Sequence, residues 1–391
     1  MKKKYLGIVL LTALVLVPVS AQSKVSPTRA SIATALFEVV SDGGSYDAET
    51  LCRELEERFE VYNRLFRFNR DSLAGPLKVV AFTDKAAYDD YIKSKLGSTR
   101  DGAVYLHYNQ ADKRELVVHR GSAEEQRMLP HQAFIQYLRA FIPYPPTWMR
   151  EGFAIYFNTL KYDKDSRELR YEENLSWLET VKNLGNQHPS LEQVFLADVK
   201  GAPEYFQPIS WAVVSFLLNN GGSGDYFRSL TDSFKVLNAG KSAGDNAQAV
   251  LNELISFTTL QQITSDYFAY IASRKTFAEL VQAGQDSYTN KNWKEAENYF
   301  LSALYQKPTH YAPYYYLGLL AYEQKDYDLA ERYYRSAVQY GADAALVSYA
   351  LGINAATAGR NDEAITYLQE AARVAPDRYK ERADSIIIRL R

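Results

Sequence analysis

Two successive predicted helices carry the residues whose types could bind a metal. His131 lies on the first helix and Glu151 on the second, and imidazole and carboxylate groups are both ligands of zinc. A hydrolytic zinc site on helices needs two His four residues apart, a carboxylate ligand and a Glu that activates water. Ile135 stands four residues after His131 and cannot bind zinc. Gln132 follows His131, and its amide cannot take a proton near neutral pH.

The residues around these positions resemble a known family of metallopeptidases. The segments that carry the resemblance are MLPHQAFI at 128–135 and PTWMREGFAIYF at 146–157. They are similar to the active-site core of peptidase MA-like enzymes, which belong to the gluzincin group. That family has His-Glu-x-x-His on one helix and Trp-x-x-Glu-Gly-x-Ala-x-Tyr on the next. The resemblance implies an α+β domain, mostly helical, over residues 45–273.

The same resemblance implies a role for each position. His131 stands at the first zinc-ligand position and Glu151 at the third. Gln132 replaces the general base and Ile135 replaces the second His. Loss of a general base typically costs about 10²- to 10⁴-fold in rate, so we expect a vestigial site, no bound metal or other cofactor, and no enzyme activity.

Other interpretations of these residues remain open. His107 and His119 fall on a predicted hairpin and could supply a substitute ligand, which would make the chain an active zinc metallopeptidase with an unusual ligand set. Alternatively, His131 is a hydrogen-bonded interior residue with Glu151 as its partner. A further alternative is a cell-envelope protein whose cleft binds a peptide or glycan without cutting it.

The elements that must position these residues follow from hydrophobic periodicity and turn signals. The pattern predicts helices at 46–68, 85–95, 122–141 and 147–157, and strands at 77–82, 104–108 and 115–119. The chain from there to residue 273 is predicted to be mostly helical, with loops near 161–172 and 219–224. Residues 22–44 are predicted to be a linker.

The C-terminal part of the chain repeats with a period of 34 residues. Three sets of small residues, each with members 34 positions apart, show this period: Gly284, Gly318 and Gly352; Ala296, Ala330 and Ala364; Ala303, Ala337 and Ala371. A fixed period of this length is the signature of stacked helix pairs. The small residues would let two helix backbones approach closely, with aromatic side chains filling the space between them.

The order of small, aromatic and Pro residues resembles the tetratricopeptide repeat (TPR) family. The resemblance covers 277–376 and implies an all-α solenoid of three repeats, at 277–310, 311–344 and 345–376, followed by a capping helix at 377–391. Arrays of this kind usually bind proteins on an extended concave surface, so we expect a protein partner in the groove of the repeats.

The family's ligand-facing positions lie on the first helix of each pair. Carried onto this chain they are Gln285, Tyr288, Tyr315, Leu319, Tyr322, Tyr349, Ile353 and Ala356. Tyr suits protein recognition because it buries a large area and keeps a polar tip. The alternative is that these Tyr pack between neighbouring helices. The Lys and Asn pattern by which some family members clamp a carboxylate is absent from these positions.

The N-terminal sequence predicts the cellular compartment in which the protein is found. Lys2, Lys3 and Lys4 precede an apolar run at 6–17 and small residues up to Ala21, which is typical of a secretory signal peptide over 1–21; an uncleaved anchor is the alternative. We therefore expect a secreted, bacterial periplasmic protein with no integral membrane segment in the mature chain. Cys52 is the only Cys, so an internal disulfide is impossible.

Charge excludes one class of partner. The formal net charge is −2, and removal of the three Lys and no acid in 1–21 takes it to −5. The chain has no basic tract or basic stripe, so nucleic acid is not expected as a partner. The sequence thus predicts a periplasmic interaction protein, with a catalytically inactive metallopeptidase-like domain joined to a TPR array.

Overall fold

The computed structural model describes residues 29–163, 168–171, 175–198, 201–219 and 225–391. The expected signal peptide at 1–21 lies outside the described residues. The chain divides into two compact units. The first is Met1–Glu57 with Gly75–Glu125, and the second is Arg58–Ala74 with Gln126–Arg391.

The first unit is built on a five-stranded mixed sheet in the order β1-β2-β3-β5-β4. The central strands β2, β3 and β5 are parallel, and β1 and β4 pair antiparallel at the two edges. Parallel strands are buried on both faces and therefore have near-continuous apolar runs, as the sequences LKVVAF of β3 and ELVVH of β5 do. The bounds are β1 Ala30–Ala33, β2 Phe37–Ser41, β3 Leu77–Phe82, β4 Ala103–Leu106 and β5 Glu115–His119.

Helix α2 (Lys85–Leu96) packs on one face of this sheet. The Asp84 side chain accepts a hydrogen bond from the Ala87 amide at its start, and Gly97 ends it in the left-handed conformation at φ 73°. Its buried Tyr88 and Ile92 pack in one cluster with Phe82, Leu106 and Val117. Two 3₁₀ turns, at Arg70–Ser72 and Ala111–Lys113, lie in the connections.

Two segments differ from the sequence-based expectation. Part of the expected linker at 22–44 forms β1 and β2. The Thr34 hydroxyl, which accepts from the Phe37 amide at 3.1 Å, closes the turn between them, and this turn lacks the Gly, Pro, Asn or Asp that usually marks a hairpin. The expected loop near 161–172 contains the antiparallel pair β6 (Leu160–Asp163) and β7 (Glu168–Tyr171).

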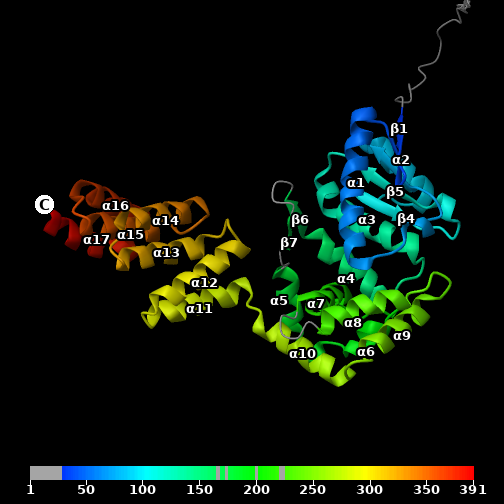
Figure 1. Cartoon of the computed structure of the whole chain (residues 1–391). Helices are drawn as coiled ribbons and strands as arrows, with labels where there is room; N and C mark the ends of the chain where they lie inside the picture. The colour runs from blue at the N-terminus through cyan, green and yellow to red at the C-terminus, as the bar shows by residue number, and fades with distance from the viewer. Residues whose placement is uncertain (1–28, 164–167, 172–174, 199–200, 220–224) are drawn as a thin grey trace, which may run out of the picture. The chain divides into compact units, whose positions relative to one another are not determined.

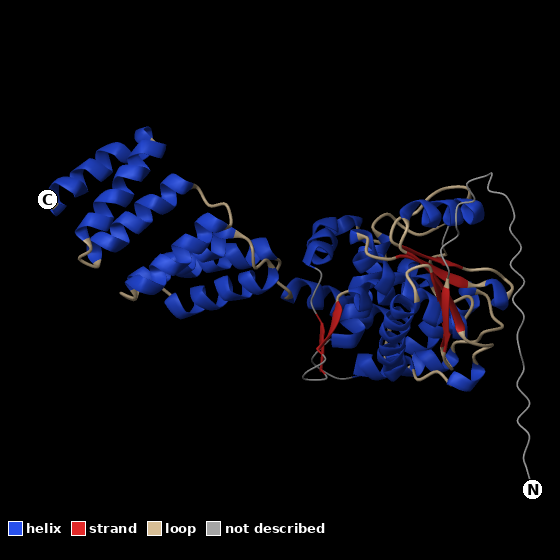
Figure 2. Ribbon diagram, turned by 90° about the horizontal axis from the view of Figure 1, so that it is seen from above, coloured by secondary structure: helices blue, strands red, loops and turns tan. Residues whose placement is uncertain are grey.

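The second unit is helical apart from that strand pair, as the helices in Figure 2 show. Helices α1 (Ser45–Phe66) and α3 (Ala123–Phe141) run across the division between the units. The remaining helices before the repeats are α4 Thr147–Asn158, α5 Leu175–Leu184, α6 Leu191–Leu196, α7 Phe206–Asn219, α8 Asp225–Ser233, α9 Ala243–Leu254 and α10 Leu260–Ser273, with 3₁₀ turns at Gly185–Gln187 and Phe234–Val236.

Aromatic residues form the core that holds α3 within the second unit. Phe59 and Tyr62, from the second half of α1, lie edge-on to Tyr137 and Phe134 of α3, with ring centroids 5.1 and 5.2 Å apart. Helices α4 and α7 approach closely at Gly152, where a Cβ atom would lie 2.4 Å from the Ser210 carbonyl oxygen. These contacts fix the two helices that carry His131 and Glu151.

The 34-residue period forms stacked helix pairs, as predicted (Figure 1). The bounds are α11 Phe277–Thr289, α12 Trp293–Gln306, α13 Tyr311–Glu323, α14 Tyr327–Gln339, α15 Ala344–Thr357, α16 Asn361–Val374 and α17 Pro376–Leu390. A Cβ atom on Gly284, Gly318 or Gly352 would lie 2.6, 2.5 or 2.7 Å from a buried side chain of the second helix of its pair. The glycines therefore set the distance within each pair.

The final helix α17 packs against the last repeat. Its Ile387 is buried in one cluster with Leu368 and Ala383, and Ile386 and Leu390 pack at the edge of that cluster. Among the described residues, no helix is both long and apolar enough to cross a bilayer.

Candidate functional sites: the His131–Glu151 pair and the tyrosine face

The fold brings together two of the residues considered for metal binding. His131 on α3 and Glu151 on α4 place Nε2 and Oε2 3.9 Å apart, and their side chains are only 15% and 13% exposed. This distance is too long for a direct hydrogen bond. The two side chains therefore lie close together, as the interior-pair interpretation predicts, but without a direct hydrogen bond between them.

Glu151 is held by other partners. Arg150 Nε donates to Oε1 at 2.8 Å, and Gln207 Nε2, on α7, donates to Oε2 at 3.1 Å. These two donors together occupy both oxygens of the carboxylate. Sequence reasoning missed both donors. Arg150 could have been found, because a charged residue beside Glu151 interrupts an otherwise apolar helix.

The surroundings of His131 disfavour its charged form. Burial lowers the pKa of its imidazole, the Glu151 carboxylate opposes this shift, and the Arg150 guanidinium adds to the lowering. The pair is thus an imidazole with a lowered pKa beside a carboxylate that Arg150 and Gln207 already bind.

The other two positions of the predicted site supply no ligand. Gln132 and the half-buried Ile135 lie on α3, which continues unbroken through Pro130. The Pro130 carbonyl accepts a hydrogen bond from the Tyr62 hydroxyl at 3.3 Å. Across the residues that the structure describes, no group of three or more His, Cys, Asp or Glu side chains is arranged to hold a metal ion.

The two other His considered as substitute ligands belong to the first unit, whereas His131 belongs to the second. His107 follows β4, and its Nδ1 lies 3.4 Å from the Tyr105 hydroxyl. His119 ends β5 and stacks on Tyr88 with ring centroids 5.3 Å apart. Each ring therefore packs against a tyrosine.

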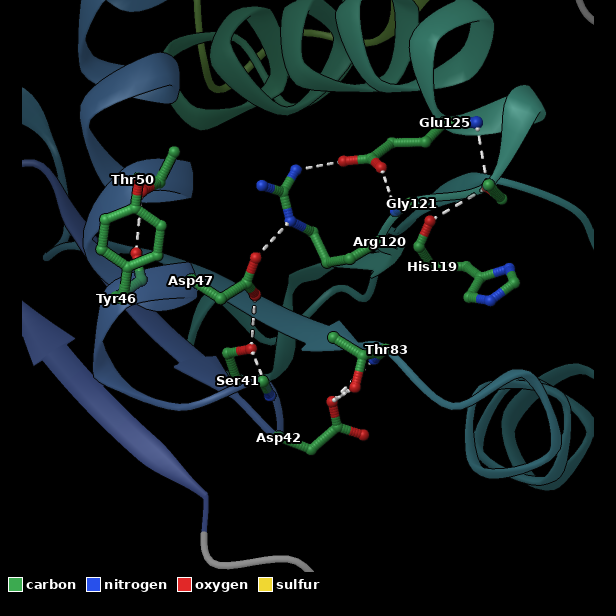
Figure 3. Close-up of polar contacts among 12 residues, drawn as sticks. Ser41, Asp42, Tyr46, Asp47, Thr50, Thr83, His119, Arg120, Gly121 and Glu125 are labelled. Carbon is green, nitrogen blue, oxygen red and sulfur yellow. Dashed lines mark hydrogen bonds and ion pairs between the residues drawn. The ribbon is translucent and has the colours of Figure 1, made fainter.

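The first unit contains a charged network that the sequence did not reveal (Figure 3). Arg120 follows β5, and its Nε donates to Asp47 Oδ1 at 2.9 Å while its Nη1 donates to Glu125. Asp47 also accepts from the Ser41 hydroxyl at 2.6 Å. The network ties the first turns of α1 and α3 to the carboxyl ends of the parallel strands. Asp47 and Arg120 are 73 positions apart in the sequence, so only the topology brings the two halves of the network together.

The predicted ligand-facing residues lie on the first helices of the three repeats and are all partly buried; we call them together the tyrosine face: Gln285, Tyr288, Tyr315, Leu319, Tyr322, Tyr349, Ile353 and Ala356. Two of them make contacts that join one helix to another. The Tyr322 hydroxyl lies 3.1 Å from the Thr357 hydroxyl and thus joins α13 to α15. Tyr349 of α15 stacks on Tyr379 of α17 with ring centroids 5.0 Å apart.

Several phenol groups at the tyrosine face lie close to one another. Tyr315 lies near enough to Tyr288 of α11 and Tyr379 of α17 for their electrostatic effects to reach its hydroxyl. Burial raises the pKa of Tyr315 to about 12. Burial, followed by the Glu323 carboxylate, raises the pKa of Tyr288 to about 12 as well. Both hydroxyls therefore remain protonated at physiological pH, and that of Tyr288 donates to the Glu323 carboxylate.

The same rings also pack between helices, which was the alternative to ligand contact. Tyr315, Leu319 and Tyr322 are partly buried against the cluster around Tyr334, and Tyr288 packs against Trp293 with ring centroids 5.2 Å apart. These side chains are only partly buried, so one part of each ring stabilises the array and another part remains accessible.

Comparisons with known proteins bear on the repeats. Residues 281–347 match the family model described as tetratricopeptide repeat. No curated protein sequence matches the chain. Among solved structures, the TPR domain of P58(IPK) is similar at 12% sequence identity, with a TM-score of 0.27, over 56% of this chain and 64% of that chain. This chain thus spans less than two thirds of that structure's length.

The 34-residue period, the glycine-to-aromatic packing within each helix pair and the family match agree with one another. Because the matched segment runs from the first repeat into the third, it covers the helices that carry most of the tyrosine face. The C-terminal region is therefore a TPR-like array of helix pairs, of which residues 281–347 match the tetratricopeptide repeat model.

Proposed function

We propose that this chain is a secreted, periplasmic protein-interaction protein whose tyrosine face binds a protein partner. The observation that carries the proposal is that Tyr315 and Tyr322 on α13 and Tyr349 on α15 keep partly accessible side chains at positions that face ligands in the repeat family. Partly exposed tyrosines combine a large apolar area with a hydrogen-bonding tip, and such residues dominate the energy of protein interfaces.

We also propose that residues 45–273 are a catalytically inactive domain of the peptidase MA-like type, without a metal cofactor. Two features support this. Ile135 and Gln132 occupy the positions of a ligand and a base, and the remaining carboxylate, Glu151, is bound by Arg150 and Gln207. Stoichiometric zinc in the purified protein, together with peptidase activity that a chelator abolishes, would contradict this part of the proposal.

Partner capture tests the role of the repeats. The tagged protein is used to capture proteins from a periplasmic extract, and recovery is quantified by mass spectrometry. Tyr315→Ala with Tyr349→Ala should reduce recovery of a specific partner at least tenfold, because truncation of an aromatic anchor commonly costs about 2 kcal/mol or more.

The matched control is Tyr305→Ala, which removes a tyrosine of α12 that is 76% exposed and lies outside the tyrosine face. Circular dichroism and thermal denaturation establish that each variant is folded. Equal recovery with the wild type and a folded double variant would place partner binding elsewhere on the chain.

A further inference from the structure

A short junction joins the repeats to the helices that precede them. Helix α10 ends at Ser273 and α11 begins at Phe277, so residues 274–276 connect the two. Arg274 is extended, with φ −85° and ψ 135°, and both sides of the junction belong to the second compact unit. A few residues between two helical parts are where a chain can change its direction.

The two halves of the junction have different partners. On the side of α10, Arg274 Nη1 donates to the Tyr270 hydroxyl at 2.7 Å, and that hydroxyl lies 3.0 Å from the buried Ser215 hydroxyl. On the side of the repeats, Gln306 Nε2 of α12 donates to the Lys275 carbonyl at 3.1 Å. Residue 274 is thus attached to the preceding helices and residue 275 to the first repeat, which places the pivot between them.

A lysine of the preceding helices contacts both sides of this pivot. Lys182 of α5 donates to the Arg274 carbonyl at 2.5 Å and to the two carboxylate oxygens of Glu279 at 2.8 and 2.7 Å. These three acceptors match the three donors of an ammonium group. The Lys182 side chain is only 19% exposed, so solvent competes weakly for its donors.

Glu279 is itself fixed to the first turn of α11. Its carboxylate accepts from the Thr276 amide at 2.7 Å, and the Thr276 hydroxyl accepts from the Glu279 amide at 3.3 Å. This reciprocal pair is a capping box, which holds the start of a helix. A cation that binds Glu279 therefore binds the first helix of the array and not a freely moving side chain.

Helix packing does not fix the angle at this junction. Among the described residues, no helix before residue 274 lies closely alongside a helix of the repeats. Within each repeat, by contrast, the two helices pack along their length, with Gly284 against Phe300 in the first pair. Polar contacts at the junction are therefore the features that can set its angle.

From these observations we infer that residues 274–276 are a hinge between the repeats and the preceding helices, and that Lys182 is the latch that holds this hinge at one angle. Its acceptors belong to the residue before the pivot and to the helix after it, so the chain cannot turn there without breaking hydrogen bonds to the ammonium group. Loss of that group, or screening of its charge, frees the array to adopt a wider range of angles. The inference goes beyond the proposed function and does not depend on it, because it concerns how the array is held and not what it binds.

Distances between two spin labels on the full chain test the inference. Glu192→Cys on α6 and Lys294→Cys on α12 give exposed attachment sites, whereas the native Cys52 is 2% exposed and is not labelled in the folded protein. Pulsed electron paramagnetic resonance then gives the distribution of distances between the labels. The labelled protein should show one narrow distribution at low salt. Lys182→Met should widen it and raise the ratio of other distances to the main distance at least about threefold.

Two further variants separate the latch from the stability of α11. Glu279→Gln removes the charge but keeps an oxygen that can accept from the Thr276 amide, since Gln also serves in capping boxes, and it should widen the distribution as Lys182→Met does. Lys235→Met is the matched control, because Lys235 pairs with Asp232 only three residues away, and it should leave the distribution unchanged. Circular dichroism establishes that each variant is folded.

Salt provides an independent check. Sodium chloride at 1 M shortens the Debye length to about 3 Å. It should widen the distribution of the protein that keeps Lys182 and change that of Lys182→Met less. Distributions as narrow in Lys182→Met and Glu279→Gln as in the unchanged protein, or equal widening by Lys235→Met, would overturn the inference. A distribution that is already wide at low salt with Lys182 present would overturn it as well.

Discussion

At the scale of single residues, glycines on the first helix of each pair leave the space that a side chain of the second helix occupies. Gly318 is buried, and the ring of Tyr334, which is 1% exposed, occupies the space that a Cβ atom would need. The same arrangement recurs at Gly284 with Phe300 and, with an aliphatic side chain, at Gly352 with Leu368. Because the ring of Tyr334 is enclosed, it cannot move aside at low cost.

Gly318→Ala should therefore destabilise the array by about 1–3 kcal/mol, the usual cost of overpacking a core. Gly244→Ala is the matched control, since Gly244 lies on the exposed side of α9 and its added Cβ would have no neighbour closer than 3.9 Å. That control should instead stabilise its helix by about 0.5–1 kcal/mol. Thermal denaturation of both variants checks the opposite signs, and destabilisation of similar size in both would contradict this account of Gly318.

A second residue-scale feature is the half-buried His188. Its Nε2 lies 3.0 Å from the Tyr267 hydroxyl, and its Nδ1 lies 2.7 Å from the Pro189 carbonyl. Burial lowers the pKa of this imidazole, and the Pro189 carbonyl partly opposes the shift.

In the unfolded chain His188 has the higher pKa, so the unfolded state takes up a proton first as the pH falls. The free energy of unfolding should consequently decrease as the pH drops below about 6.5, the ordinary value for His. His188→Gln should reduce this dependence. Denaturant titrations at pH 7.5 and 5.0 measure it, and an unchanged dependence in the variant would show that His188 does not contribute.

At the scale of elements, the structure could be predicted where the signals are local. The repeat helices follow from a 34-residue period, and β3, α2 and β5 follow from apolar runs and from turn residues such as Asp84 and Gly97. The pairing of β1 with β2 could not be predicted, because Thr34 closes their turn with a side-chain hydrogen bond. The Gln207–Glu151 contact joins residues 56 positions apart, and nothing in the sequence indicates that pairing.

The capping helix α17 illustrates how one element closes the array. Ile387 is 6% exposed against the last repeat, and its sequence neighbour Ile388 is 74% exposed. Ile387→Ala should cost about 2–5 kcal/mol, because it opens a cavity in a buried cluster. Ile388→Ala should change stability by no more than about 0.5 kcal/mol. Equal melting temperatures for the two variants would show that α17 does not stabilise the repeats.

At the scale of the whole molecule, two regions differ in what their chemistry can support. The His131–Glu151 pair combines an imidazole whose pKa is lowered by burial with a carboxylate that is already bound by Arg150 and Gln207. The repeats instead present uncharged, partly accessible tyrosines over several helices. We therefore assign the binding role to the repeats. The candidate positions come from the repeat family's pattern and stay a prediction, whereas the extent to which each ring also packs between helices could not be predicted, because it depends on how deeply the ring is buried.

Photocrosslinking inside the cell tests this assignment most directly. A photoreactive phenylalanine analogue replaces either Tyr315 on the tyrosine face or Tyr305, which is 76% exposed outside it. After irradiation, we expect a discrete crosslinked protein from position 315 and none from position 305. Crosslinks to that protein from position 305 alone, or no crosslink from position 315 in a correctly folded protein, would show that the tyrosine face does not bind the partner.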